Sequence, residues 1–261
     1  MRRTLVAGLA AALLAVPAQA ALPEDRAPAG WTPGVGAAAR WAQERTGAVS
    51  FAVRTPAGLW CLRCDVVVDA ASVTKVLLLA AYLRRDAVAR RPLQARERRR
   101  LAAMVRRSDD DAANRVAVVV GTAGPRRVAR AAGLASTVPR MPVWGATRTT
   151  ARDQTQLMLQ IDRLLPPRHR AFGMRLLATV VASQRWGVGR VAPPCWQLFF
   201  KGGWGAGTGR VEHQVALLRR GAERFSLVVM TTGNRGKRDG ERTLEGVAGR
   251  LLSRLPAPAG C

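Results

Sequence analysis

The sequence predicts an α/β (α+β) fold in which one antiparallel sheet is flanked by helices and interrupted by an all-helical lobe. Strand-like runs occur in two places only, within residues 49–69 and within residues 196–231, and a long stretch of helical character separates them. If both groups of strands join in one sheet, the helical stretch becomes an insertion. The cleft of the molecule is then expected where the two lobes meet.

The first half of the chain supports this order element by element. Residues 35–45 are Ala-rich and favour a helix, and the hairpin signature Thr55-Pro56-Ala57-Gly58 separates two β-prone runs, 49–53 and 58–62. A short extended piece is expected over 65–69. Residues 76–83 are apolar on every side, which predicts a helix buried at the centre of the molecule.

The second half of the chain is also assigned from its side-chain pattern. Five further helices are expected, over 94–104, 108–120, 126–132, 150–164 and 170–181. Strand character returns over 196–200, 211–218 and 225–231, and a closing helix is expected over 242–255.

The N-terminus has the three parts of a secretory signal peptide: Arg2-Arg3, an apolar stretch over 5–16, and the small-residue site Ala18-Gln19-Ala20. A membrane anchor is the competing interpretation, but this stretch is short for a span. We therefore expect a secreted, extracytoplasmic protein without a stable membrane span. The expected division is a signal peptide (1–20), a tether (21–34), an α/β lobe (35–71 and 183–255), a helical lobe (72–182) and a C-terminal tail (256–261).

The formal net charge of +25 falls to +23 when the leader, which carries two arginines and no acid, is removed. Such a charge attracts polyanions, which outside a cell are wall or membrane polymers. The basic residues are spread along helix-like segments without interleaved aromatic residues, a pattern that favours a compositional bias and speaks against nucleic acid. Anionic wall polymers stay open as partners, and a monomer is expected.

Four cysteines are present, and an exported protein can pair them in two disulfides with any of three connectivities. They are Cys61, Cys64, Cys195 and Cys261. The Cys-x-x-Cys spacing also fits half of a zinc site or a redox pair. There is no second such pair, and His169 and His213 are the only histidines, so disulfides or plain thiols are favoured over metal.

Among 42 basic residues only three are lysine, namely Lys75, Lys201 and Lys237. A lysine can lose its proton when desolvated and act as a base, whereas a guanidinium stays protonated. Lys75 closes Ser72-Val73-Thr74-Lys75 at a helix start, where residues three apart share a face and the amine can approach the hydroxyl. The competing interpretation is a helix-capping serine with a surface lysine. Lys237 lies in a segment typical of a solvated turn, 234–238.

Two further elements follow in order: Ser108-Asp109-Asp110 at a helix start, and Lys201-Gly202-Gly203 at a strand end. Taken singly, Ser108 could be a helix cap and Lys201 a charged strand end. Together with the Ser-x-x-Lys motif they resemble the penicillin-recognising serine acyl enzymes, which comprise class A β-lactamases and penicillin-binding D-alanyl-D-alanine peptidases.

The resemblance extends over residues 35–255. Residues 149–153 look like the helix start after the omega loop of these enzymes. Residues 184–188, together with Lys201-Gly202-Gly203-Trp204, are similar to small actinobacterial serine hydrolases of this superfamily. The resemblance implies a β-lactamase/transpeptidase-like fold.

The resemblance also implies roles for individual residues. Ser72 would be the nucleophile, Lys75 its proton acceptor, Ser108 the relay to the leaving nitrogen, and Lys201 the group that tunes Ser108. The backbone N–H groups of Ser72 and Trp204 would form the oxyanion hole. Substrate contacts would come from Asp110, Gly203 and Trp204. Asp109 would hold the lobes together, and no metal or organic cofactor is implied.

Three departures from the family pattern concern substrate recognition and turnover. Gly202 stands where Thr or Ser is usual, and Asp110 stands where Asn is usual. No acidic residue occurs between Asp111 and Asp153, so the omega-loop Glu that drives deacylation in class A enzymes is missing. Glu212 and His213 could offer a base, but alternation along a strand allows at most one of them to point inward. Both are more readily explained as surface or core residues.

The sequence thus predicts a secreted serine acyl hydrolase that attacks a β-lactam or a related amide or ester through an acyl-serine, with weak or atypical deacylation. A D-alanyl-D-alanine peptidase acting on a peptidoglycan-type peptide, or an esterase of the same fold, is the alternative within the enzyme class. A non-catalytic binder of wall polymers is the alternative of another class. A Ser-His-Asp hydrolase is disfavoured because no Gly-x-Ser-x-Gly motif occurs.

Overall fold

The computed structural model describes residues 24–205, 207 and 209–256. The expected signal peptide, Cys261 and most of the expected tail lie outside the described residues. No helix of the described part is both long and apolar enough to cross a membrane.

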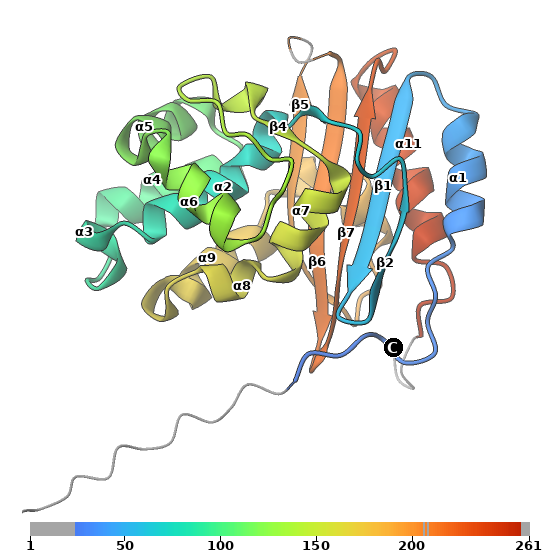
Figure 1. Cartoon of the computed structure of the whole chain (residues 1–261), viewed down its shortest axis with the longest axis horizontal. Helices are drawn as coiled ribbons and strands as arrows, with labels where there is room; N and C mark the ends of the chain where they lie inside the picture. The colour runs from blue at the N-terminus through green and yellow to red at the C-terminus, as the bar shows by residue number, and fades with distance from the viewer. Residues whose placement is uncertain (1–23, 206, 208, 257–261) are drawn as a thin grey trace, which may run out of the picture.

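A five-stranded antiparallel sheet forms the centre of the molecule, in the order β2-β1-β7-β6-β5 (Figure 1). Its strands are β1 (Ala48–Thr55), β2 (Gly58–Leu62), β5 (Gln197–Gly205), β6 (Val211–Arg220) and β7 (Glu223–Thr232). The junction between the two groups of strands is the β1–β7 pair, with Val53 opposite Leu227. The predicted fold class is therefore confirmed.

Helices cover both faces of the sheet (Figure 1). On one face lie α1 (Val35–Gln43) and α11 (Lys237–Leu251), which pack on each other. On the other face α7 (Ala151–Leu159) packs on β1, β6 and β7, and α9 (Pro167–Ala178) packs on β5. The remaining helices are α2 (Thr74–Leu83), α3 (Asp86–Ala89), α4 (Ala95–Arg106), α5 (Asp110–Val120), α6 (Ala123–Ala131), α8 (Ile161–Leu164) and α10 (Val188–Val191), with short 3-10 helices η1 (Ala71–Val73), η2 (Trp144–Ala146) and η3 (Ala182–Gln184).

Alternate strand residues point to two separate cores, as the period of two requires. Phe199, Val215 and Val228 join the core shared with the helical side, whereas Phe200 and Val229 join the core under α1 and α11. All ten residues of α2 are buried, in agreement with the prediction of a central helix without a polar face. This helix carries Lys75 into the interior.

Three local predictions need correction. The helix expected over 150–164 is divided at Gln160, whose side chain donates to Ala132 O at 2.8 Å and whose backbone leaves the helical region. The closing helix starts at Lys237 instead of 242, so Lys237 lies in a helix and not in a solvated turn. Residues 24–34, expected as a tether, pack on the body, where Trp31 is buried against Phe225 with ring centroids 4.6 Å apart.

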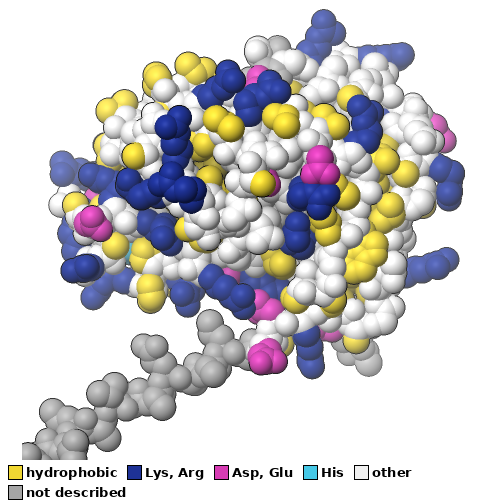
Figure 2. Space-filling model, in the orientation of Figure 1, with side chains coloured by type: hydrophobic (Ala, Val, Ile, Leu, Met, Phe, Trp, Pro, Cys, Tyr) yellow, Lys and Arg dark blue, Asp and Glu magenta, His cyan; other side chains and the backbone are white. Residues whose placement is uncertain are grey.

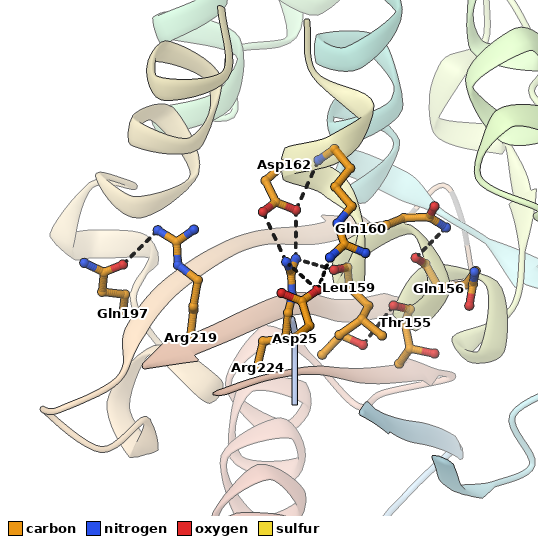
Figure 3. A network of polar contacts seen from close by, with 11 residues as sticks. Asp25, Thr155, Gln156, Leu159, Gln160, Asp162, Gln197, Arg219 and Arg224 are labelled. Atoms are coloured by element: carbon orange, nitrogen blue, oxygen red, sulfur yellow. Dashed lines mark hydrogen bonds and ion pairs between the residues drawn. The ribbon is translucent and has the colours of Figure 1, made fainter. Parts of the chain in front are cut away.

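A buried ion network ties this N-terminal segment to both lobes (Figure 3). Arg224 of β7 bonds Asp162 of α8 at 2.8 Å and Asp25 at 3.1 Å, and it also donates to Leu159 O. Burial opposes the charges on Arg224 and Asp162, and their pairing lowers the pKa of Asp162 overall. Because the partners compensate each other, the network holds the end of α7, the start of α8 and β7 together.

Two cysteine predictions can be compared with the structure. Cys61 and Cys64 form a disulfide, and Cys195 is also disulfide-bonded. Within the described part of the chain, no group of three or more His, Cys, Asp or Glu side chains is arranged to hold a metal ion.

Candidate active site

Ser72 lies in the short helix η1, between the strand β3 (Val68–Asp69) and α2. It keeps 8% of its surface exposed. The residue before it, Ala71, has a positive φ of 46°, which turns the chain sharply. Within the described chain the Ser72 N–H donates to no backbone carbonyl. This N–H is therefore free to stabilise an oxyanion.

The edge strand β5 passes directly beside Ser72. A Cβ placed on Gly203 would lie 2.9 Å from Val73 N, 3.0 Å from Ser72 N and 3.1 Å from Ala70 O. Only glycine allows so close an approach of two backbones. Gly203 thus brings the backbone of β5, and with it Trp204, next to the free N–H of Ser72.

Lys75 is the second residue of α2 and is fully buried. Its Nζ donates to Ser108 O at 2.6 Å, to Ser108 Oγ at 3.1 Å and to Asp110 Oδ1 at 2.6 Å. It makes no hydrogen bond with Ser72 Oγ, although the sequence spacing places both on one face. In this structure the amine is turned towards Ser108 and Asp110 and not towards the Ser72 hydroxyl.

Ser108 receives a second amine from the sheet. Lys201 Nζ, which is also buried, donates to Ser108 Oγ at 2.9 Å and to Gly202 O at 2.6 Å. Ser108 has a positive φ of 57°, so the chain presents this hydroxyl inward just before α5 begins. Two amines from segments 126 residues apart, 201 − 75, thus converge on one hydroxyl.

Asp109, and not Ser108, caps α5. Its carboxylate accepts from Ala112 N–H at 2.7 Å, whereas Ser108 is occupied by the two lysines. The hydrogen bond that the structure gives Asp109 is therefore local to α5 and does not connect the lobes. This corrects the expectation that Asp109 bridges them.

Burial lowers the pKa of both lysines. For Lys75 the loss of solvation is the largest effect, and the nearby Asp110 carboxylate opposes it by favouring the ammonium. For Lys201 burial and then the repulsion from Lys75 hold the pKa well below its ordinary value. A buried amine with a lowered pKa can exist in its neutral form and accept a proton, which a general base must do.

The comparisons with known proteins agree with this geometry. The model of the Beta-lactamase enzyme family matches residues 90–255, which is more than half of the chain. The chain belongs to this family. No curated protein sequence matches it.

Solved structures of the same fold are distant in sequence. A β-lactamase from Sphaerobacter thermophilus DSM 20745 is 19% identical, with a TM-score of 0.71 over 84% of this chain and 95% of that one. The reconstructed last common ancestor of Gram-negative bacteria class A β-lactamase is also 19% identical, with a TM-score of 0.69 over 84% of this chain and 98% of that one. At this identity the likeness establishes the fold alone.

Asp110 distinguishes this member of the family. The resemblance implied a substrate contact at this position, but here the carboxylate forms an ion pair with Lys75 at 2.6 Å. Its side chain is 70% exposed, while that of Lys75 is fully buried. The pair therefore connects the buried amine to the surface, and an Asn at this position would not hold the ammonium in the same way.

Sequence reasoning missed an aromatic residue at Lys75. Trp144 of η2 places its ring 4.7 Å from Lys75 Nζ, and its Nε1–H donates to Asn114 Oδ1 at 2.8 Å. The loop that carries Trp144 is fixed from its base by Asp153, which accepts from Ser136 N–H and Thr137 Oγ1–H. An indole thus contacts Lys75 from the segment between Asp111 and Asp153, which contains no acidic residue.

The missing hydroxyl at Gly202 is replaced by aromatic surface. A Cβ on Gly202 would meet Trp186 at 3.2 Å and Trp204 at 3.5 Å, and the two indoles contact each other edge to face. Gln214 holds Trp186 in place by donating to its carbonyl at 2.6 Å and accepting from Val188 N–H at 2.7 Å. A side chain at position 202 would press on the Trp186 ring, which would have to move by a few tenths of an ångström.

Glu212 and His213 are both buried, but on opposite faces of β6. His213 donates from Nε2 to Asp69 O at 2.9 Å and accepts at Nδ1 from Thr231 N–H, and burial lowers its pKa to about 4. Neither residue hydrogen-bonds any of the three active-site side chains Ser72, Lys75 and Ser108. His213 is a neutral residue that fixes the strand before Ser72, which agrees with the interpretation as a core residue.

Proposed function

We propose that the protein is a serine acyl hydrolase whose nucleophile is Ser72. The observation that carries this proposal is the convergence of Lys75 and Lys201 on Ser108 Oγ, beside a serine whose backbone N–H is free. A structural role does not explain two buried amines on one hydroxyl beside a serine with a free N–H. Unpaired buried ammonium groups would destabilise the fold.

The proposed acylation uses these groups after the Lys75 amine turns from Ser108 and Asp110 towards Ser72. Neutral Lys75 accepts the Ser72 Oγ proton, and Oγ attacks the substrate carbonyl carbon. The N–H groups of Ser72 and Trp204 stabilise the oxyanion. The carbon–nitrogen or carbon–oxygen bond breaks as Ser108 Oγ–H donates its proton to the leaving atom. Ser108 is reprotonated from Lys201 or Lys75, which both donate to it.

Deacylation is the slow step of the proposed cycle. Water must be activated to attack the acyl-serine, and the segment between Asp111 and Asp153 supplies no acid. The Lys75–Asp110 pair is the remaining group that can take a proton from water. Because the Asp110 carboxylate favours the ammonium form of Lys75, which cannot take a proton from water, we expect acyl-enzyme to accumulate with a β-lactam.

The proposed substrates are β-lactams and related activated amides or esters. Gly202 has no hydroxyl to hold a substrate carboxylate, and the indole of Trp186 lies 3.2 Å from the place of a Cβ there. A substrate carboxylate then receives fewer hydrogen bonds from the protein. Substrates that lack a carboxylate are therefore expected to react about as fast as substrates that carry one. This favours a broader acyl hydrolase, including an esterase, over a strict D-alanyl-D-alanine peptidase.

Labelling with a fluorescent penicillin tests the proposal. Wild type is expected to give a covalent band that persists through denaturing electrophoresis, and Ser72→Ala is expected to give none. Ser253→Ala, an exposed serine near the end of α11, serves as the matched control and should label like wild type. A chromogenic cephalosporin measures turnover in parallel. Labelling of Ser72→Ala at the wild-type level would overturn the proposal.

We further propose that the protein acts outside the cytoplasm. Disulfides persist in oxidising compartments, and Cys61, Cys64 and Cys195 are all disulfide-bonded. The leader-like N-terminus supports the same conclusion.

A non-catalytic wall binder is the second candidate, supported by the net charge of +25. In Figure 2 the Lys and Arg side chains are scattered over the visible face and do not form one stripe. Such a surface would attract polyanions weakly, and it offers no continuous row of charges along which a polymer could align. Binding to anionic wall polymer without any covalent adduct would favour this candidate over the enzyme.

A further inference from the structure

A cavity lies on the face of β5 opposite Ser72, where the ends of β5 and β6 meet the start of α11. Its volume is about 300 Å³, room for about ten water molecules. Trp204 and Glu212, which are paired across β5 and β6, form its wall on the sheet side. The lining further includes Arg210, Asn234, Arg235 and Lys237. Only the backbone of the edge strand separates this cavity from the nucleophile.

Two buried oxygens in this wall have no partner. Glu212 is 4% exposed, its Oε2 has no hydrogen bond, and neither of its carboxylate oxygens is bonded within the described chain. Asn234 is 1% exposed, and its Oδ1 is also unpaired, although its Nδ2 donates to Arg210 O and Thr231 Oγ1. Buried polar atoms are usually satisfied, and an unsatisfied one costs about 1 to 3 kcal/mol.

The two side chains lie next to each other behind α11. A Cβ on Gly240 would collide with Glu212 Cγ and come within 3.0 Å of Asn234 Nδ2. The absence of a side chain at Gly240 therefore lets both pack under the helix. Both residues also line the cavity, and the oxygen without a partner on each side chain can accept from a ligand with several N–H donors.

The other charges of the lining have the opposite sign. Lys237 Nζ lies 5.3 Å from the Trp204 ring centroid and 3.4 Å from Glu241. Arg210 and Arg235 form no ion pair among the described residues. A simple amine would be repelled by these cations, and a simple anion would face the acceptor pair. A ligand that carries both charges satisfies each part of the lining.

We propose that this cavity binds a small zwitterion of the α-amino acid class. Its ammonium would donate to the oxygens of Glu212 and Asn234 beside the Trp204 indole, which also attracts cations. Its carboxylate would lie towards Arg235 and Lys237, where guanidinium and ammonium groups bind carboxylates. This binding does not depend on Ser72 and holds whether or not the acyl hydrolase function is confirmed.

Isothermal titration calorimetry at pH 8 tests the proposal, with glycine, both enantiomers of alanine, and serine as ligands. At least one of these is expected to bind. N-Acetylalanine, which lacks the ammonium, and alanine methyl ester, which lacks the carboxylate, are each expected to bind at least tenfold more weakly than alanine itself. Absence of binding for every free amino acid, or equal binding of the two blocked forms, would overturn the proposal.

Matched variants locate the site. Glu212→Gln keeps the size of the side chain and is expected to weaken binding at least tenfold, while circular dichroism verifies its fold. Glu245→Gln, on the exposed part of α11 that faces Arg190, should bind like wild type. Ser72→Ala should also keep full binding, which separates this site from the acylation site. Unchanged affinity in Glu212→Gln would contradict the assignment.

Discussion

Replacement of Asp110 by Asn removes the charge that holds Lys75 protonated. The two groups are 2.6 Å apart, at which a charge pair contributes about 1.6 kcal/mol even in the dielectric of water and several times more in a protein interior. Because the Asp110 side chain is 70% exposed, the lower figure applies. That energy corresponds to roughly a tenfold change in the equilibrium between ammonium and neutral amine.

The sign of the effect on rate follows from the proposed role of Lys75. Acylation needs the neutral amine, so its rate rises with pH through the pKa of Lys75. Burial already lowers that pKa, and Asp110 opposes the effect. Asp110→Asn therefore moves the rising limb of the profile to lower pH. At pH values where Lys75 of the wild type is protonated, the variant should acylate up to about tenfold faster.

The assay is stopped-flow or rapid-quench acylation by a fluorescent penicillin over pH 5 to 9. Asp111→Asn is the matched control, since Asp111 lies in the same first turn of α5 without an ion pair to Lys75. Its profile should coincide with that of wild type. A profile of Asp110→Asn that is unshifted or moves to higher pH would refute the reasoning, as would an equal gain in Asp111→Asn.

Three further changes give separate expectations. Gly203→Ala places a methyl group against Ser72 N and should reduce penicillin labelling at least a hundredfold while the protein stays folded; labelling at the wild-type rate would contradict the close approach. Burial raises the pKa of Glu212 to about 8 from 4.5, so wild type loses stability as pH rises from about 4.5 to 8. At pH 8 the free energy of unfolding of Glu212→Gln, measured in urea, should therefore exceed that of wild type by up to about 4 kcal/mol. At pH 4 the two proteins should be equally stable. A lower free energy of unfolding for the variant at pH 8 would argue against a neutral, unpaired carboxyl. Arg224→Met leaves Asp162 buried without its partner, so the free energy of unfolding in urea should fall by about 3 to 5 kcal/mol. An unchanged midpoint of the urea transition would contradict this expectation.

The sequence predicted those parts of the structure that depend on local patterns. The apolar run over 76–83 predicted a central helix, and α2 is fully buried. The turn signature over 55–58 predicted the β1–β2 hairpin, which the register from Thr55 opposite Gly58 confirms. Such features need only the side-chain period and the turn residues.

The parts that were missed depend on contacts between distant segments. Asp110 was expected to meet substrate, yet it pairs with Lys75, 35 residues earlier. Trp144 and Trp186 gave no local signal, because an indole in a loop does not indicate which residue it will contact. Lys237 was assigned to a turn because Asn234 and Gly236 precede it, but it starts α11 and lies over Trp204.

Glu212 shows the same limit in another form. Alternation along a strand allowed at most one of Glu212 and His213 to point into the site, and each was explained as a surface or a core residue. Both are buried because helices cover both faces of the sheet, and this layering is a property of the whole fold. A buried carboxyl without a partner is therefore visible in the structure alone.

Intact-protein mass spectrometry of the mature chain after exposure to a penicillin tests the central claim most directly. Attack by Ser72 opens the lactam without loss of atoms, so the protein should gain the full mass of the penicillin. Peptide analysis should place the adduct on Ser72, and it should persist for minutes or longer because no omega-loop acid activates water. An unchanged mass with penicillins and with activated esters alike, or an adduct on another residue, would contradict the account.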